Sequence, residues 1–233
     1  LDFCVNLGDT IDREWRSYDA ILAPLAGSRH RWEHVLGNHD FALLDGEKTQ
    51  VDARLGIAAR YRFFDRPGFR FVVLDTGAVS TYASVAGTEA RQEAVAELAR
   101  VKARKLPQAQ DWNGAVGPKQ LAWFEGVAAD ASRRGLKVVV FAHHPVAPVG
   151  SYDAWDATEV LAALGRHRNV VAWFNGHHHA GGFAQVEGLP CVTFHGMVET
   201  PDRNAFATAR FLADRVILEG HGREPSRELV FRS

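Results

Sequence analysis

Short apolar runs alternate with helical patterns along the whole chain, and this alternation is the feature that most limits its fold. Runs such as "KVVVFA" and "NVVAWF" have the length of buried strands. Strands that alternate with helices favour an α/β domain built in layers. We therefore expect residues 1–233 to form one α/β domain with a substantial core, since 46% of the residues are hydrophobic.

Residue patterns predict where the strands and helices of this domain lie. Strands are expected at "DFCVNL", "WEHVL", "RYRFF", "FRFVVLD", "KVVVFA" and "NVVAWF". Helices are expected at residues 13–25, 88–105 and 118–134, and the capping-box pattern "DATE" at 156–159 indicates the start of another. In the first helix one face is apolar: Trp15, Tyr18, Ile21, Leu22 and Leu25. The segments "LPCVTFHG", "AFATARFLA" and "RVILEG" predict a C-terminal β-meander.

Composition and charge disfavour several classes of partner. Lys and Arg number 27 and Asp and Glu number 28, so no basic excess points to nucleic acid. Apolar stretches are too short to span a bilayer, and we see no sign of an obligate protein partner. The two cysteines, Cys4 and Cys191, lie in apolar stretches and favour a reducing compartment, so we expect a cytoplasmic protein.

Polar clusters follow four of the predicted strands. They are "GDTID" at 8–12, "GNHD" at 37–40, "HHP" at 143–145 and "HHH" at 177–179. Ligands of open α/β sheets bind beyond the carboxyl ends of the strands. Each cluster alone is typical of a turn, a helix cap or a solvated loop, but four together favour a binding site. The candidate residues are Asp9, Asp12, Asn38, His39, His143, His177 and His179.

The donor types in these clusters favour a metal centre. Imidazole, carboxylate and amide oxygen suit manganese, iron, zinc or cobalt. The lack of cysteine near the clusters disfavours a structural zinc site. In an extended "G-H-x-H" segment, His177 and His179 point to one side and His178 points away. We therefore expect the first and third of these histidines to be ligands.

Taken in order, "GDTID", "GNHD", "AHHP" and "GHHH" resemble the calcineurin-like metallophosphoesterase superfamily. Longer segments, among them "WNGAVGPKQLAWF" and "VETPDRNAFATARF", are similar to its manganese-dependent ADP-ribose/CDP-alcohol diphosphatases. The resemblance implies a four-layer αββα sandwich. It also implies two divalent metal ions, with manganese favoured over iron, zinc or cobalt, that activate water for phosphoryl transfer.

The resemblance implies a role for each matching residue. It implies these metal ligands: Asp9 between the two metals, Asn38, His143 and His177 at the second metal, and His179 at the first. His39 matches a histidine that protonates the leaving group, and Asp12 matches the carboxylate that orients it. Arg13 matches a phosphate-binding arginine of related phosphatases, although a solvent-facing helix arginine is the alternative. Phe41 and Phe206 are candidates to stack on a base, with core packing as the alternative.

The expected substrate is a small nucleotide-containing molecule, cleaved at its pyrophosphate, such as ADP-ribose or a CDP-alcohol. A cyclic-nucleotide phosphodiesterase, a phosphomonoesterase or a non-catalytic binding protein on the same scaffold remains an alternative. The superfamily's first motif, Asp-x-His or a close variant, is not found in residues 1–7, and the chain starts at Leu1 inside a strand-like run. We therefore expect an N-terminal strand and two ligands of the first metal to be missing, with low turnover as the result.

Overall fold

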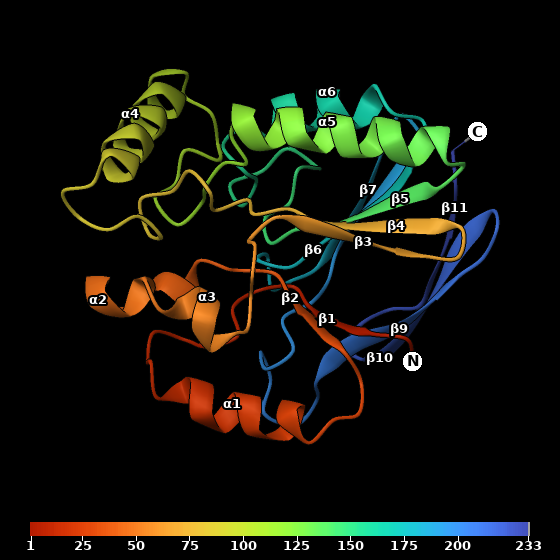
Figure 1. Ribbon diagram of the computed structural model, residues 1–233, viewed down its shortest axis with the longest axis horizontal. Helices are drawn as coiled ribbons and strands as arrows, with labels where there is room; N and C mark the ends of the chain where they lie inside the picture. The colour runs from red at the N-terminus through yellow and green to blue at the C-terminus, as the bar shows by residue number, and fades with distance from the viewer. Residues whose placement is uncertain (233) are drawn as a thin grey trace.

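The computed structural model describes residues 1–232 and has a six-stranded mixed sheet at its centre (Figure 1). In spatial order, the strands are β3 (Arg62–Arg66), β4 (Phe69–Val73), β5 (Lys137–Phe141), β6 (Val170–Asn175), β8 (Leu189–Thr193) and β7 (Gly182–Val186). β4, β5, β6 and β8 run parallel, and β3 and β7 pair antiparallel at the two edges. The parallel strands therefore end at one edge of the sheet, as the polar clusters in the sequence predict.

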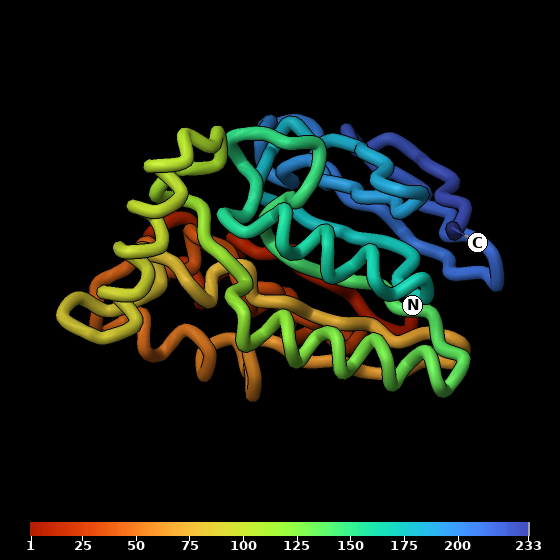
Figure 2. The backbone as a smooth tube through the Cα atoms, turned by 90° about the horizontal axis from the view of Figure 1, so that it is seen from above, coloured from red at the N-terminus to blue at the C-terminus, as the bar shows by residue number. Residues whose placement is uncertain are grey.

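Helices α5 (Pro118–Arg133) and α6 (Ala157–Gly165) cover one face of this sheet, side by side (Figure 2). Alternate side chains of β5 divide between the two faces. Val138 and Val140 pack under the helices, whereas Val139 and Phe141 pack toward the other sheets. Because both faces are covered, these strands are apolar along their whole length, which is why they are recognisable in the sequence.

Two smaller sheets face the other side. One is the antiparallel sheet of β9 (Ala205–Phe211), β10 (Arg215–Gly222) and β11 (Arg227–Val230). The other is the parallel pair of β1 (Cys4–Asn6) and β2 (Trp32–His34). Helix α1 (Ser17–Ala26) lies beyond them in Figure 1. The molecule therefore has the four layers of the expected αββα sandwich: helices α5 and α6, the central sheet, the two smaller sheets, and helix α1.

The predicted C-terminal meander is wrong in its first strand. β8 inserts between β6 and β7 in the central sheet, and only β9 and β10 pair as expected, with β11 as a third strand. All five residues of β8 are buried, because helices and sheets cover both of its faces. The local pattern of an apolar strand does not tell which sheet it joins.

The start of one helix and the predicted cap of another also differ from the prediction. α1 begins at Ser17 and not at residue 13, since Arg13 has a left-handed backbone with φ of 70°. Its expected inward residue Ile21 is 40% exposed. α6 begins after Asp156 as "DATE" predicts, but the Asp156 carboxylate does not cap it. It accepts hydrogen bonds from the N–H groups of Val116 and Gly117 and so fixes the loop before α5.

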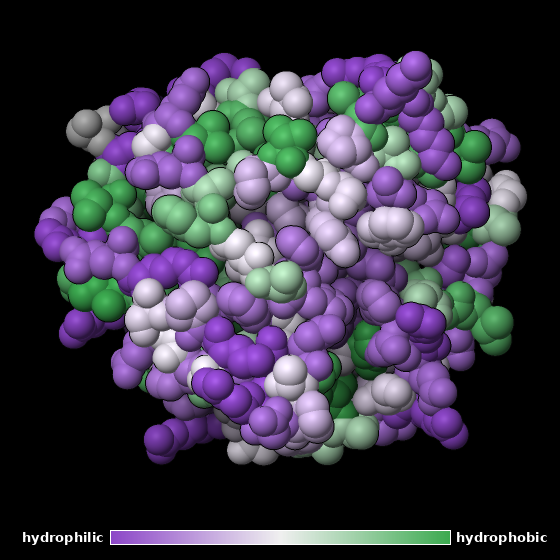
Figure 3. All heavy atoms as spheres, turned by 180° about the vertical axis from the view of Figure 1, so that it is seen from behind, coloured by the Kyte–Doolittle hydropathy of each residue, from purple (hydrophilic) through white to green (hydrophobic). Residues whose placement is uncertain are grey.

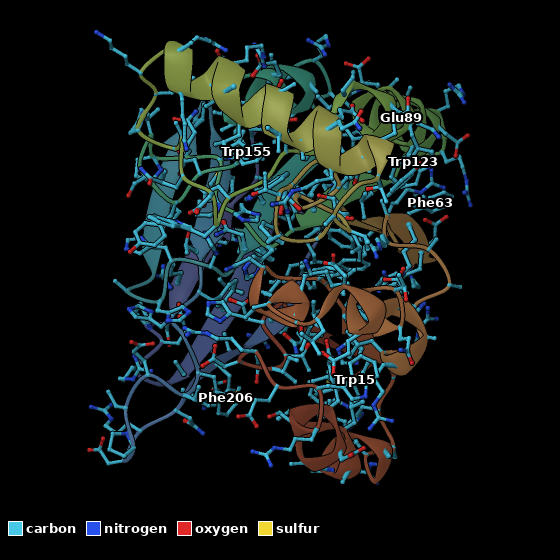
Figure 4. The ribbon with its side chains drawn as sticks, turned by 90° about the vertical axis from the view of Figure 1, so that its left-hand side faces the viewer. Trp15, Phe63, Glu89, Trp123, Trp155 and Phe206 are labelled. Atoms are coloured by element: carbon cyan, nitrogen blue, oxygen red, sulfur yellow. The ribbon has the colours of Figure 1, made fainter. Side chains whose placement is uncertain are left out.

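The remaining helices lie at the periphery. α4 (Glu89–Ala103) buries few residues and packs on Trp155, as its thin apolar stripe predicts (Figure 4). The short helices η1 (His39–Phe41), α2 (Asp45–Lys48) and α3 (Val51–Arg54) follow β2. On the face drawn in Figure 3, apolar side chains form small groups among hydrophilic ones. Among residues 1–232, no helix is both long and apolar enough to cross a membrane.

Candidate metal centre

Four strands deliver donor side chains to the same edge of the molecule. Asp9 follows β1, Asn38 follows β2, His143 follows β5 and His177 follows β6. Figure 4 looks onto this edge. The structure thus brings together four of the five predicted ligands, including Asn38 and His143, which are 105 positions apart in the chain.

His143 is the centre of this cluster. Its Nε2 lies 3.2 Å from Asn38 Oδ1, 3.4 Å from Asp9 Oδ2 and 3.1 Å from His177 Nδ1. Its Nδ1 lies 2.8 Å from the main-chain oxygen of Leu7, to which it donates. Burial lowers the pKa of His143, but the charge of Asp9 and the hydrogen bond with Asp9 outweigh burial and raise it. Without its Nε2 proton, as a metal ligand must be, His143 presents the Nε2 lone pair to the other three donors.

These distances fit a divalent ion. Ligand atoms about 2.0–2.2 Å from one ion lie roughly 3–3.5 Å from each other. The Asn38 amide oxygen and the Asp9 carboxylate are acceptors, so a neutral His143 Nε2 beside them lacks a hydrogen to share. A cation between the lone pairs satisfies all of them at once. The donor set of one carboxylate, one amide oxygen and two imidazoles suits manganese and its neighbours.

Asp9 is held ionised at the centre by its surroundings. With no ion bound, burial raises the pKa of Asp9, but the charge of a protonated His143 and hydrogen bonds from His143 and His39 outweigh burial and lower it to about 2. The main-chain N–H of His39 donates to Asp9 Oδ1 at 2.9 Å. The backbone at Gly37 passes so close that a Cβ there would lie 2.2 Å from Asp9 Oδ1. Only a residue without a Cβ therefore lets the Asp9 carboxylate take this position.

His177 reaches the cluster from a turn. Its φ is 66°, so the expectation of an extended segment with His177 and His179 on one side is wrong. Its Nδ1 faces His143, and its Nε2 lies 2.9 Å from Asn113 Oδ1. Burial and the neighbouring histidines lower the pKa of His177 well below its usual value, so the imidazole is neutral.

His178 and His179 both lie outside this cluster. The ring of His178 stacks on Tyr152 with centroids 4.2 Å apart, in keeping with its expected exclusion from the ligands. His179 is half exposed, and its Nδ1 pairs with Glu199 at 2.7 Å. His179 is near enough to lower the pKa of His177, but its recorded partner is a carboxylate and not one of the four donors.

A further buried histidine, His144, touches the cluster. Its ring centroid lies 4.3 Å from that of His177, and a nitrogen of each ring lies within 4.8 Å of a nitrogen of His143. However, its Nδ1 lies 2.7 Å from Thr76 Oγ1, and its Nε2 faces the main-chain oxygen of Trp112. Burial lowers the pKa of His144 to about 3. Because both nitrogens have partners, we assign His144 to the support of the ligands.

The predicted proton-transfer pair lies beside the cluster. His39 Nδ1 lies 2.6 Å from Asp12 Oδ1, and the hydrogen bond from His39 lowers the pKa of Asp12. Arg13 Nε donates to the same oxygen at 2.9 Å. Arg13 faces solvent, as the alternative interpretation expects, but it precedes α1 and is not helical.

The two aromatic candidates differ in position. Phe41 is only 2% exposed and packs with Tyr18 and Val51 in a core cluster, with the Arg60 guanidinium 4.8 Å from its ring centre. Phe41 is therefore a core residue, which was the alternative interpretation, and its ring is not accessible to a base. Phe206 is half exposed in β9, where it stacks on His221 (Figure 4).

The sequence interpretation missed Asp40 and Asn113. Asp40 is fully buried and accepts hydrogen bonds from the N–H groups of Thr10 and Gly37, which ties the two loops that carry Asp9 and Asn38. Burial, together with the nearby Asp9, raises the pKa of Asp40 to about 6. Both residues stand in the quoted motifs "GNHD" and "WNGAVGP", but there they read as turn residues.

Comparison with known proteins yields one family model and a set of relatives. The family model described as Calcineurin-like phosphoesterase matches residues 1–181. A manganese-dependent ADP-ribose/CDP-alcohol diphosphatase of Bos taurus is 33% identical over 74% of this chain, which spans only 55% of that relative. The protein of the same name from Danio rerio is 30% identical over 94% of this chain and 80% of its own length. The crystal structure of a dimetal phosphatase from Danio rerio superposes with a TM-score of 0.84 at 27% identity, covering 98% of this chain and 84% of its own.

Proposed function

The chain belongs to the calcineurin-like phosphoesterase family, and we propose that it is a metal-dependent phosphohydrolase that cleaves the pyrophosphate of nucleoside diphosphate-linked compounds. ADP-ribose and CDP-alcohols are the substrates that we propose, because the relatives are named for them. The chain spans about half the length of the Bos taurus relative, so its substrate requires a test of its own.

One observation carries this proposal: the four donors, His143 Nε2 and the three atoms around it, lie next to the His39–Asp12 pair. The main-chain N–H of His39 binds the same carboxylate, Asp9, that faces His143. Two divalent ions, with manganese preferred, supply activated water and neutralise phosphoryl charge when bound. We assign Asn38, His143 and His177 to one ion, Asp9 to both, and His179 to the other.

The residues beside the ions have their own proposed tasks. His39 donates a proton to the departing oxygen, and the Asp12 carboxylate holds its Nδ1–H and so leaves Nε2 free for that transfer. Arg13, exposed beside this pair, offers its guanidinium to a phosphate oxygen. Phe206 offers an exposed ring on which a base can stack. Both cysteines are free, which supports a cytoplasmic location.

The test compares substrate classes at equal protein concentration in manganese. We expect ADP-ribose to yield AMP and ribose 5-phosphate, and a CDP-alcohol to yield CMP, at rates above those for a phosphomonoester or a cyclic nucleotide. A His143→Ala variant is the control for contaminating hydrolase, and it should be inactive on every substrate. Cleavage of monoesters or cyclic nucleotides with ADP-ribose left intact would refute the proposed substrate.

A further inference from the structure

Asn113 is buried in the loop between α4 and α5 and contacts His177, which lies 64 positions further along the chain. Its Nδ2 donates to the main-chain oxygens of Gln108 at 3.0 Å and Ser151 at 2.7 Å. Both amide hydrogens are therefore used. The remaining polar atom, Oδ1, accepts hydrogen bonds and lies 2.9 Å from His177 Nε2.

This arrangement leaves one choice of hydrogen position for a neutral His177. An acceptor opposite Nε2 requires the hydrogen on Nε2, because two lone pairs at 2.9 Å repel each other. The other nitrogen, Nδ1, then carries the lone pair. Nδ1 is the atom that lies 3.1 Å from His143 Nε2, on the side of the converging donors.

From this geometry we propose that Asn113 is a positioning residue that selects the Nε2–H tautomer of His177 and aims its Nδ1 at the metal. The inference rests on the proposed metal-dependent function, since it assumes that His177 is a ligand. The partner on the second nitrogen of a ligating histidine fixes the orientation of the ring and contributes to metal affinity. For His143, the main-chain oxygen of Leu7 has the same task.

The loop around Asn113 is built to hold it still. Val79 and Ala115 exchange two main-chain hydrogen bonds, and the N–H of Trp155 donates to the oxygen of Gly114 at 2.7 Å. A Cβ on Gly114 would lie 2.7 Å from the main-chain oxygen of Thr76, so this backbone packs closely against the chain after β4. A carboxamide on such a fixed backbone has little freedom to turn away from His177.

A matched pair of variants tests the proposal. Asn113→Ala removes two hydrogen bonds to main-chain oxygens and the contact to His177. Asn169→Ala also removes two such bonds, to Ala128 and Leu136, but Asn169 precedes β6 whereas His177 follows it, so the control lies at the opposite end of the strand. Calorimetric titration with Mn²⁺ in the absence of substrate should show about 10–100-fold weaker binding for Asn113→Ala. The Mn²⁺ affinity of the Asn169→Ala control should stay within about twofold of that of the unchanged protein, because Asn169 shares no contact with the ligands.

A spectroscopic readout separates positioning from a general structural defect. Long-range ¹H–¹⁵N spectra of the metal-free protein, labelled at histidine, should show His177 as the Nε2–H tautomer and a mixture of tautomers in Asn113→Ala. An Nδ1–H tautomer in the unchanged protein would overturn the inference even if the variant failed to fold. So would unchanged Mn²⁺ affinity in a folded Asn113→Ala variant. Mn²⁺ binding without ADP-ribose hydrolysis would instead count against the proposed substrate alone.

Discussion

The Nδ1 of His39 lies 2.6 Å from a carboxylate oxygen of Asp12, although the two residues are 27 positions apart in the chain. The Asp12 side chain is 70% exposed, so the pair lies at the protein surface beside the metal cluster and not in the core. The backbone of His39 meanwhile donates to Asp9. One residue thus connects a donor of the metal cluster to an exposed acid–base pair.

Replacement of His39 by Ala should slow hydrolysis and leave the metal in place. Groups that transfer protons contribute about 10²–10⁴-fold to the rate. Steady-state rates should fall by that factor, whereas bound manganese, measured by elemental analysis, should stay near its original level. His30→Ala, in the loop before β2, is the control and should keep both. Loss of metal in proportion to the rate would show that His39 is a ligand.

Gly37→Ala should damage the metal site through a single methyl group. The new Cβ would lie 2.2 Å from Asp9 Oδ1 and 2.4 Å from Asp9 N, so the loop must move. Overpacking of this kind costs about 1–3 kcal/mol, and the displaced Asp9 should weaken Mn²⁺ binding. Gly126→Ala, in α5, is the matched control, since a Cβ there meets no atom within 4 Å.

Chemical denaturation measures the first effect and metal titration the second. Gly126→Ala should raise the free energy of unfolding by about 0.5–1 kcal/mol, because alanine favours the helix, with metal affinity unchanged. Equal stability of Gly37→Ala and the unchanged protein would mean that the loop adjusts at little cost.

Asp156 should make the protein less stable as pH rises from about 4 to 6. Burial raises the pKa of Asp156 from 3.8 to about 6 in the folded protein. Between these values the folded state binds more protons than the unfolded state, so the free energy of unfolding falls with rising pH. The contribution is roughly 1.4 kcal/mol per pH unit within this window.

The measurement compares unfolding curves of the unchanged protein and Asp156→Asn at several pH values. Asparagine does not titrate, so the difference in stability should move in favour of Asp156→Asn as pH rises to 6 and then level off. Asp111→Asn, at an exposed position, serves as the control and should keep the original slope. A parallel pH dependence of Asp156→Asn and the unchanged protein would contradict the assignment.

The chain of 233 residues should bind one manganese ion tightly and a second one weakly. Asp9, Asn38, His143 and His177 converge, whereas His179 is paired with Glu199. Four well-placed donors hold an ion firmly, and two donors do so poorly. Titration with Mn²⁺ should therefore show two unequal sites. Asn38→Ala should abolish the tight site and leave the circular dichroism spectrum, and so the fold, unchanged. Two tight and equivalent sites would point to ligands outside this set.

The sequence predicted strands β3 to β6 of the central sheet and the edge at which the site forms, but it did not predict the edge strand β7. β5 and β6 are covered on both faces, so their apolar runs are unmistakable, and polar clusters mark their ends. The sequence could not predict that β8 joins this sheet, since pairing depends on distant partners. It also missed the turn at His177 and the role of Asn113. The sequence alone does not tell whether an asparagine in a loop is buried against a ligand or exposed in a turn.

The donors of the cluster come from strands of two different sheets, β1 and β2 on one side and β5 and β6 on the other. An ion bound there is a cross-link between the sheets that only the folded chain can form. Its binding energy therefore adds to the free energy of unfolding, by about 2.7 kcal/mol at a free ion concentration of 100 times Kd. The thermal midpoint of this protein thus becomes a gauge of the manganese available around it, and a chelator acts on it as a mild denaturant.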